Sequence, residues 1–164
     1  MIAAYLDTAY LLKLYWPEPG SEAVRALADR VDVIVCSLHG RAELITAAHR
    51  KLREAPGAGA NLKFQISSLK SGGPAALDAL LAQVAADQAA GAIAWLPITE
   101  AHLDRVAKVV RRAPATVYLR AADALHLASA AEAGFAEIYS NDRHLLAAAP
   151  LFGLRGIDVI GAAG

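Results

Sequence analysis

The sequence has little cysteine, no net charge and no long uncharged hydrophobic run, and each absence narrows the possible classes of protein. The single cysteine, Cys36, lies inside an apolar stretch. We therefore expect it as a buried strand residue, neither a metal ligand nor half of a disulfide, in a reduced setting. Sixteen Lys and Arg residues balance sixteen Asp and Glu residues, so no net field draws the molecule to nucleic acid or membranes. Any phosphate-binding surface must be local.

The hydrophobic runs are short. Asp7 interrupts the first of them, and nowhere do about 18 uncharged apolar residues follow one another. We expect no export signal and no membrane span, and hence a cytoplasmic protein. The length of 164 residues and the hydrophobic content of 56% suit one domain with a substantial core, so we expect a single domain over residues 1–164.

Short apolar runs alternate with helical patterns along the chain. Because these runs read as strands buried on both faces, they predict a doubly wound α/β fold with a parallel sheet. The predicted strands are residues 2–6, 31–36, 92–97, 137–140 and 157–160. The predicted helices are residues 9–15, 22–28, 38–53, 75–90, 100–112, 121–133 and 145–149. Gly134 is expected as a C-cap, and Pro150 as the end of the last helix.

Two breaker clusters, residues 55–60 and 71–74, interrupt this pattern. The segment between them has weak helical character, so we expect a helical insertion or flap around residues 54–91.

Four acidic residues stand where this fold would bring them together. Asp7 and Asp142 each follow a predicted strand, Glu43 lies on the polar side of a helix, and Asp123 opens a helix that is apolar nearly all round. In open α/β sheets, ligands bind beyond the carboxyl ends of the strands. Two carboxylates about 4 Å apart repel by roughly 4 kcal/mol at an effective dielectric of 20, so four need a cation to stay ionised. The set predicts a site for a hard divalent ion such as Mg²⁺, with metal-activated water attacking a phosphodiester.

Each acid also has a purely structural interpretation. Asp7 could cap the helix that follows, and Asp142 could be a turn or cap residue. Glu43 could be a solvated helix residue paired with Arg50 or Lys51, and Asp123 could complement the helix dipole. The joint occurrence of the four favours a functional site.

Four segments that carry these acids resemble, in order, the motifs of PIN-domain ribonucleases, above all the VapC toxins of type II toxin–antitoxin modules. They are Tyr5-Leu6-Asp7-Thr8-Ala9-Tyr10-Leu11-Leu12, Ser37 with Arg41-Ala42-Glu43-Leu44, Ala122-Asp123-Ala124-Leu125-His126-Leu127-Ala128-Ser129-Ala130, and Tyr139-Ser140-Asn141-Asp142-Arg143-His144-Leu145. The resemblance covers residues 2–160. The chain is longer than most small toxins of this type, chiefly through residues 54–90.

The resemblance implies a three-layer α/β/α sandwich with a central, mostly parallel five-stranded sheet. It also implies one or two Mg²⁺ or Mn²⁺ ions, endonucleolytic cleavage of RNA, a homodimer or larger assembly, and a cognate antitoxin. Matched by motif, Asp7, Glu43, Asp123 and Asp142 are the catalytic, metal-binding acids. Thr8, Ser140 and Asn141 match the supporting polar positions.

An acidic pocket repels RNA, so basic residues must hold the phosphates. The candidates are Arg143, which adjoins Asp142, together with Arg120 and Arg50 beside Lys51. His39 and His126 are expected as helix-face or core residues, since their spacing matches no zinc motif.

Two other classes stay open. An aspartyl-phosphate phosphatase would want a second Asp where Ala9 stands. A PIN-like binding module without catalysis would show metal affinity but no turnover.

Overall fold

The computed structural model describes residues 1–54 and 74–161. The centre of the predicted insertion or flap, residues 55–73, lies outside the described residues. On either side of the gap the chain is helical, since α3 (Leu38–Glu54) precedes it and α4 (Pro74–Ala89) follows it. None of the helices in the described ranges is long and apolar enough to cross a membrane.

The predicted parallel sheet is present as two parts that meet at a seam. One part contains three strands in the order β1 (Ala3–Tyr5), β2 (Val33–Ser37) and β3 (Ile93–Leu96). The other pairs β4 (Glu137–Tyr139) with β5 (Arg155–Ile157). A parallel bridge between Leu6 and Tyr139 joins β1 to β4, so the five strands run in the order β3, β2, β1, β4, β5. All of these pairings are parallel.

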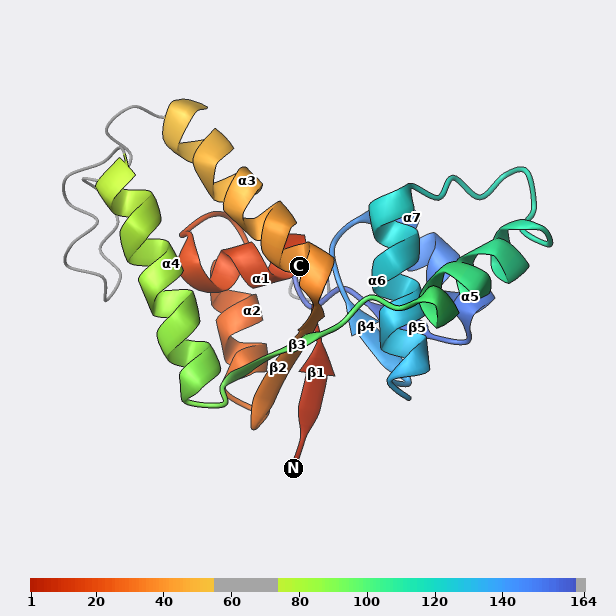
Figure 1. The fold of residues 1–164 in the computed structure, drawn as a ribbon, viewed down its shortest axis with the longest axis horizontal. Coiled ribbons are helices and arrows are strands. Elements are labelled where there is room, and N and C mark those ends of the chain that lie inside the picture. The colour runs from red at the N-terminus through yellow and green to blue at the C-terminus, as the bar shows by residue number, and fades with distance from the viewer. Residues whose placement is uncertain (55–73, 162–164) are drawn as a thin grey trace.

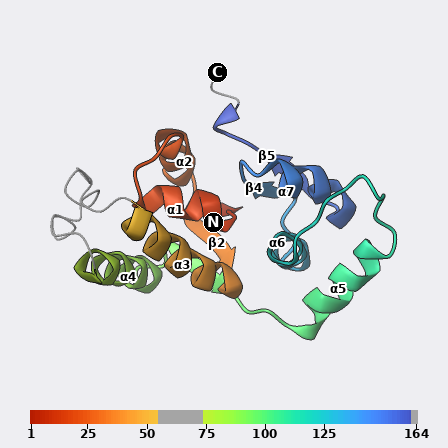
Figure 2. The same ribbon diagram turned by 90° about the horizontal axis from the view of Figure 1, so that it is seen from above.

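Helices cover both faces of the sheet, which gives three layers (Figures 1 and 2). The helices are α1 (Thr8–Tyr15), α2 (Ser21–Ala28), α3, α4, α5 (Glu100–Val110), α6 (Ala121–Glu132), α7 (Arg143–Ala148) and the 3₁₀ turn η3 (Ala149–Phe152). In both views α1 to α4 lie on one side of the strands, and α5 to α7 lie on the other.

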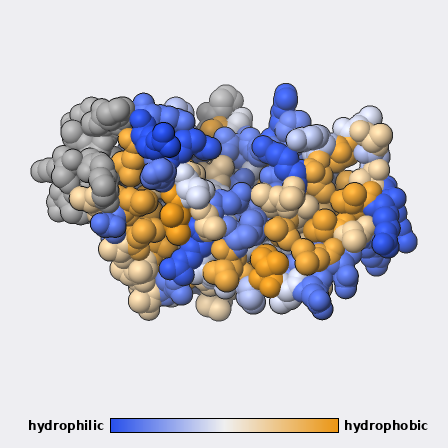
Figure 3. Space-filling view, turned by 45° about the horizontal axis from the view of Figure 1, so that its top comes forward, coloured by the Kyte–Doolittle hydropathy of each residue, from blue (hydrophilic) through white to orange (hydrophobic). Residues whose placement is uncertain are grey.

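Alternating strand residues supply the two cores between these layers, because successive side chains of a strand point to opposite faces. Ala4, Leu6 and Ile34 belong to the cluster that includes the apolar residues of α1 to α4. Tyr5 and Val35 belong to the cluster built with α6, α7 and η3. On the face drawn in Figure 3, hydrophilic surface lies between two apolar areas.

The last strand was placed too late in the sequence. It covers Arg155–Ile157 rather than residues 157–160. Asp158 explains the difference, because its carboxylate accepts bonds from the Ile160 amide at 2.8 Å and the Gly161 amide at 3.1 Å. Such a side-chain turn ends strand pairing.

The two predicted helix ends had different outcomes. Gly134 adopts a φ of +78° directly after Ala133, the C-cap residue of α6, and so occupies the left-handed capping position expected of this glycine. Pro150 does not follow the final turn of α7, which ends at Ala148; it lies within η3.

Candidate active site

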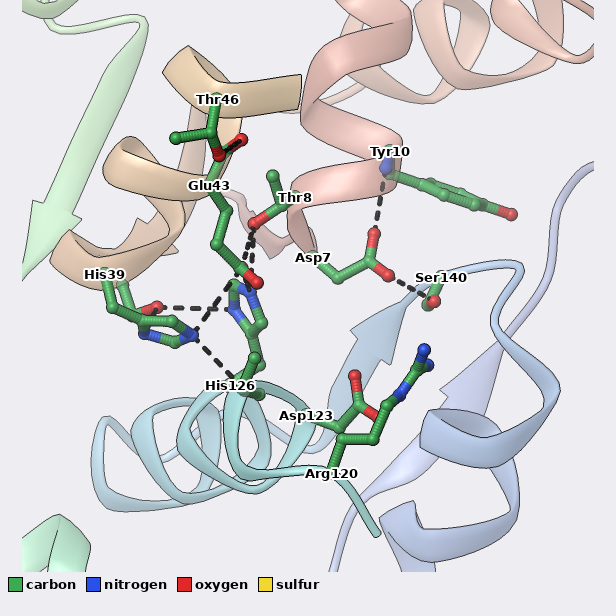
Figure 4. A network of polar contacts seen from close by, with 12 residues as sticks. Asp7, Thr8, Tyr10, His39, Glu43, Thr46, Arg120, Asp123, His126 and Ser140 are labelled. Carbon is green, nitrogen blue, oxygen red and sulfur yellow. Dashed lines mark hydrogen bonds and ion pairs between the residues drawn. The ribbon is translucent and has the colours of Figure 1, made fainter. Parts of the chain in front are cut away.

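The four acids line one cleft although they come from four separate elements. Asp7 follows β1 and Asp142 follows β4, while Glu43 projects from α3 and Asp123 from the first turn of α6. All four border a hollow of about 490 Å³. In Figure 4 the Asp7 carboxylate points toward Tyr10 and Ser140, and the Glu43 carboxylate points toward Thr8 and His126. The carboxyl edge of the sheet therefore carries the acidic pocket that the sequence predicts.

Asp7 both caps a helix and faces the cleft. One carboxylate oxygen accepts the Tyr10 amide at 2.8 Å, which makes Asp7 the N-cap of α1. The other oxygen accepts a hydrogen bond from the Ser140 hydroxyl. Burial raises the pKa of Asp7, and the bonds from Ser140 and Tyr10 oppose that rise. The structural and functional interpretations of Asp7 are thus compatible, since each oxygen has further lone pairs.

Glu43 is held by groups from two neighbouring helices rather than by Arg50 or Lys51. The Thr8 hydroxyl donates to its Oε2 at 2.7 Å, and His126 Nε2 lies 3.0 Å from the same oxygen. Burial would raise the pKa of Glu43, but the hydrogen bonds from His126 and Thr8 lower it to about 2. Glu43 therefore presents an ionised, oriented carboxylate at neutral pH.

His126 is a core residue, as expected, but it also contacts the acid set. Its side chain is only 3% exposed, and its Nδ1 lies 3.3 Å from both the Tyr5 hydroxyl and the Ser37 hydroxyl. His126 follows Asp123 by three positions on α6, which puts both on one helix face. That spacing is the sequence signal that could have linked His126 to the site.

The close approach of α3 to α6 depends on Gly40. A Cβ at this position would lie 2.6 Å from Cys36 Sγ, 2.9 Å from His126 Cε1 and 3.1 Å from Thr8 Oγ1. Any larger residue would push α3 away from the groups that bind Glu43 one turn further on.

Arg120 connects the other two acids. Its Nε donates to Asp123 Oδ2 at 2.8 Å, and its Nη2 forms an ion pair with Asp142. Asp142 also caps α7 by accepting the His144 amide at 2.8 Å. Burial would raise the pKa of Asp142, but the bonds from His144 and Arg120 lower it. A guanidinium thus balances part of the acidic charge.

The remaining supporting residues differ in position. Ser140 is fully buried, and besides donating to Asp7 it accepts the Asp142 amide at 2.9 Å, so it links two of the acids. Asn141, which lies between Ser140 and Asp142 in the sequence, is exposed.

The basic candidates do not all face the cleft. Arg50 and Lys51 line it, together with Glu18, which pairs with Lys51. Arg143 does not line the cleft; it is exposed, and its Nε lies 3.3 Å from the ring of His144. The structure therefore places positive charge at the α3 end of the pocket and at Arg120.

The donor set fits a hard divalent cation, because carboxylate and hydroxyl oxygens predominate in the pocket. Asp7, Glu43, Asp123 and Asp142 line the pocket, and they stay the predicted ligands of such an ion.

Solved structures share this fold at low sequence identity. VapC20 from Mycobacterium tuberculosis, described as a sarcin–ricin loop cleaving toxin, aligns with a TM-score of 0.60 at 18% identity, over 88% of this chain and 94% of its own. FitAcB from Neisseria gonorrhoeae gives 0.65 at 19% identity, over 95% of this chain and 97% of its own. VapBC2 from Rickettsia felis, solved with a DNA fragment from its promoter, gives 0.57 at 12%, over 96% and 98%.

The search of curated proteins found no match. The family model of the PIN domain matches residues 4–150, which is most of the chain and includes all four acids. The chain therefore belongs to the PIN domain family.

Proposed function

We propose that the protein is a Mg²⁺-dependent endoribonuclease and the toxin of a type II toxin–antitoxin module. One observation carries the proposal: four acids from four elements of a PIN domain line a single cleft. The span of the family match supports the expectation that the chain forms one PIN domain.

The acids would divide the work of holding the ion. We assign direct contacts to Asp7 and Asp123, which are the buried acids among the residues that line the cleft. Glu43 and Asp142 would bind directly or through water and orient the attacking water, one of them serving as general base. When bound, one or two Mg²⁺ ions, or Mn²⁺ in their place, polarise phosphate oxygens and activate water for hydrolysis. Arg120 must then exchange its contacts with Asp123 and Asp142 for other partners.

Basic residues beside the acids would hold the RNA backbone. Arg50 and Lys51 line the same cleft as the acids, so they are placed to contact phosphates next to the scissile bond. Arg120 would contact the scissile phosphate after it leaves Asp123. Arg143, which lies outside the cleft lining, would contact a phosphate further away.

The first experiment incubates the purified protein with labelled structured RNA in Mg²⁺ or Mn²⁺. An EDTA control removes the ion, and Asp123→Asn removes one charge while it keeps side-chain size. Discrete cuts that are lost in both controls support the proposal. If the protein binds Mg²⁺ in calorimetry but cuts no RNA, the PIN-like binding module replaces the nuclease. If it neither binds metal nor cuts, the metal site itself is wrong.

The toxin assignment rests on the motif resemblance and on the fold shared with VapC20. A cognate antitoxin would lay a short segment in the acidic cleft, with an Arg or Lys against the carboxylates. Arg120 supports this mode, because it is a guanidinium paired with both Asp123 and Asp142.

Expression of the protein should arrest growth. The candidate antitoxin is the protein encoded next to it, which on co-expression should bind this chain and relieve the arrest. If the neighbour does neither, the chain is a PIN nuclease of another kind. We expect a homodimer, and size-exclusion chromatography with light scattering measures its mass.

A further inference from the structure

We propose that His39, Glu43 and His126 form a second metal site, for a transition ion such as Zn²⁺, at the edge of the acidic cleft. We further propose that an ion bound there withdraws Glu43 from the magnesium centre and so inhibits RNA cleavage. The inhibition rests on the proposed function, whereas the binding does not.

Three potential ligand atoms from two helices converge. One atom of each residue lies within 4.8 Å of the other two. Glu43 Oε2 lies 3.0 Å from His126 Nε2 and 3.7 Å from His39 Nε2. Two ligands bound tetrahedrally at the usual zinc distances are roughly 3.3–3.6 Å apart. The cluster therefore needs shifts of only a few tenths of an ångström at these two distances. The ion replaces the contacts of His126 Nε2 with Glu43 Oε2 and with Thr8 Oγ1, each at 3.0 Å.

Contacts at Nδ1 hold both imidazole rings in orientation. His126 Nδ1 faces the hydroxyls of Tyr5 and Ser37, each at 3.3 Å. His39 Nδ1 lies 2.7 Å from the same Ser37 hydroxyl. Metal-binding histidines commonly hydrogen-bond through the ring nitrogen that does not hold the ion. This arrangement directs Nε2 of both rings toward Glu43, as Figure 4 shows.

His39 has one bond to exchange. Its Nε2 lies 3.2 Å from the Ala122 carbonyl oxygen, and that contact would be lost when the ion binds. His39 and Glu43 are four residues apart on α3, which places them on one helix face. His126 comes from α6, so the site exists only in the folded chain.

The histidine ligands of this site favour a different kind of ion from the one that the four carboxylates favour. Imidazole nitrogen suits Zn²⁺ and its neighbours, whereas Mg²⁺ prefers oxygen. Three protein ligands leave a fourth position of a tetrahedral ion for water. Glu43 and His126 line the cleft, so solvent reaches that position.

The test measures Zn²⁺ binding by calorimetry in excess Mg²⁺, which competes with Zn²⁺ for any site made of oxygen ligands alone. His39→Gln removes one ligand from a half-buried position, and His49→Gln is its matched control, because His49 is exposed on the same helix. We expect one Zn²⁺ per chain and at least about tenfold weaker binding in His39→Gln, with no change in His49→Gln. Asp123→Asn should also keep the Zn²⁺ affinity.

Equal Zn²⁺ affinity in His39→Gln and His49→Gln would overturn the site. So would a loss of Zn²⁺ binding in Asp123→Asn but not in His39→Gln, since the ion would then sit among the carboxylates. Glu43→Gln is the second variant, and it too should weaken binding about tenfold or more. Circular dichroism checks that each variant is folded before calorimetry.

Zinc inhibition is measured separately, with each variant compared with its own zinc-free rate. The Zn²⁺ concentration that halves Mg²⁺-dependent cleavage should rise at least about tenfold in His39→Gln. An unchanged value, with Zn²⁺ binding lost, would overturn the regulatory step alone. If the wild type cleaves no RNA in Mg²⁺, the proposed function fails, while the calorimetry still decides the zinc site.

Discussion

Gly40→Ala tests how closely α3 must approach α6 to build the site. The added methyl would meet Cys36 Sγ at 2.6 Å, His126 Cε1 at 2.9 Å and Thr8 Oγ1 at 3.1 Å. The first two distances are shorter than real Cβ contacts allow, and neither partner is the free end of a flexible exposed chain. Cys36 and His126 are both buried, so relief requires α3 itself to move.

The magnitude follows from two opposing effects. Overpacking a close-packed region costs about 1–3 kcal/mol. Replacing Gly by Ala inside a helix returns about 1 kcal/mol through backbone propensity. With three close contacts the cost lies in the upper part of its range, and we expect a net loss of about 1–2 kcal/mol in the free energy of unfolding. At a urea m-value of about 2 kcal/mol/M, the midpoint falls by roughly 0.5–1 M.

Urea denaturation followed by circular dichroism measures this change. Ala42→Gly, at an exposed position on the same helix, gives the propensity effect by itself and should destabilise by about 1 kcal/mol. If Gly40→Ala stabilises the protein by as much as Ala42→Gly destabilises it, propensity alone governs position 40 and the packing argument is wrong. Cys36→Ala combined with Gly40→Ala should recover part of the loss, with a coupling of at least about 0.5 kcal/mol.

Three further predictions concern the acids and the basic end of the cleft. Ser140→Ala leaves buried Asp7 without its hydroxyl donor and should cost about 1–3 kcal/mol in urea denaturation; a change below about 0.5 kcal/mol would contradict the link. The pKa of Glu43 is lowered from 4.5 to about 2, so its contribution to stability is complete above pH 4.5 and disappears as the pH falls through 2. The difference in free energy of unfolding between wild type and Glu43→Gln should shrink as the pH falls through that window. A difference that stays constant would refute the lowered pKa of Glu43. Lys51→Gln is made in an Asp123→Asn background, which should bind RNA without cutting it. It should lower the slope of log affinity for RNA against log salt concentration by about one. Exposed Arg53→Gln is its control, and equal slopes would exclude Lys51 from the phosphate contacts.

Local patterns were enough to predict the sheet and the positions of two acids. Short apolar runs define the strands, and Asp7 and Asp142 follow β1 and β4 because chain direction fixes the carboxyl edge of a parallel sheet. The boundary of β5 was wrong because Asp158 forms local bonds that compete with pairing, and apolar periodicity does not register such competition.

The surroundings of Glu43 could not be read from one helix. The sequence of α3 suggests an apolar stripe through Leu38, Ala42, Ile45 and Ala48. The buried residues of α3 are Gly40, Leu44 and Ala48, so only Ala48 of that stripe is buried. Hydrophobic periodicity does not identify a glycine as a packing position. The sequence therefore did not show which face of α3 packs against the core. The packing of that face turns Glu43 toward His126, a contact between residues 83 positions apart.

The sequence also could not predict that Arg120 contacts both Asp123 and Asp142. Arg120 precedes α6 directly, so its reach to Asp123 three residues on is local. Its contact with Asp142 depends on how α6 packs beside the end of β4, which is a tertiary property. The sequence predicted a basic residue near the acids but not which acids it would pair with.

The seam between β1 and β4 makes the cleft depend on whether the two sheet parts stay joined. Asp7 follows β1, whereas Ser140 and Asp142 follow β4, and the Asp7 amide donates across the seam to the Tyr139 carbonyl at 3.1 Å. Hydrogen exchange of that one amide proton therefore reports the free energy of the opening that separates the acids. A ligand that bridges both edges must slow this exchange in step with its affinity. A single backbone proton thus records occupancy of the cleft without any need for turnover.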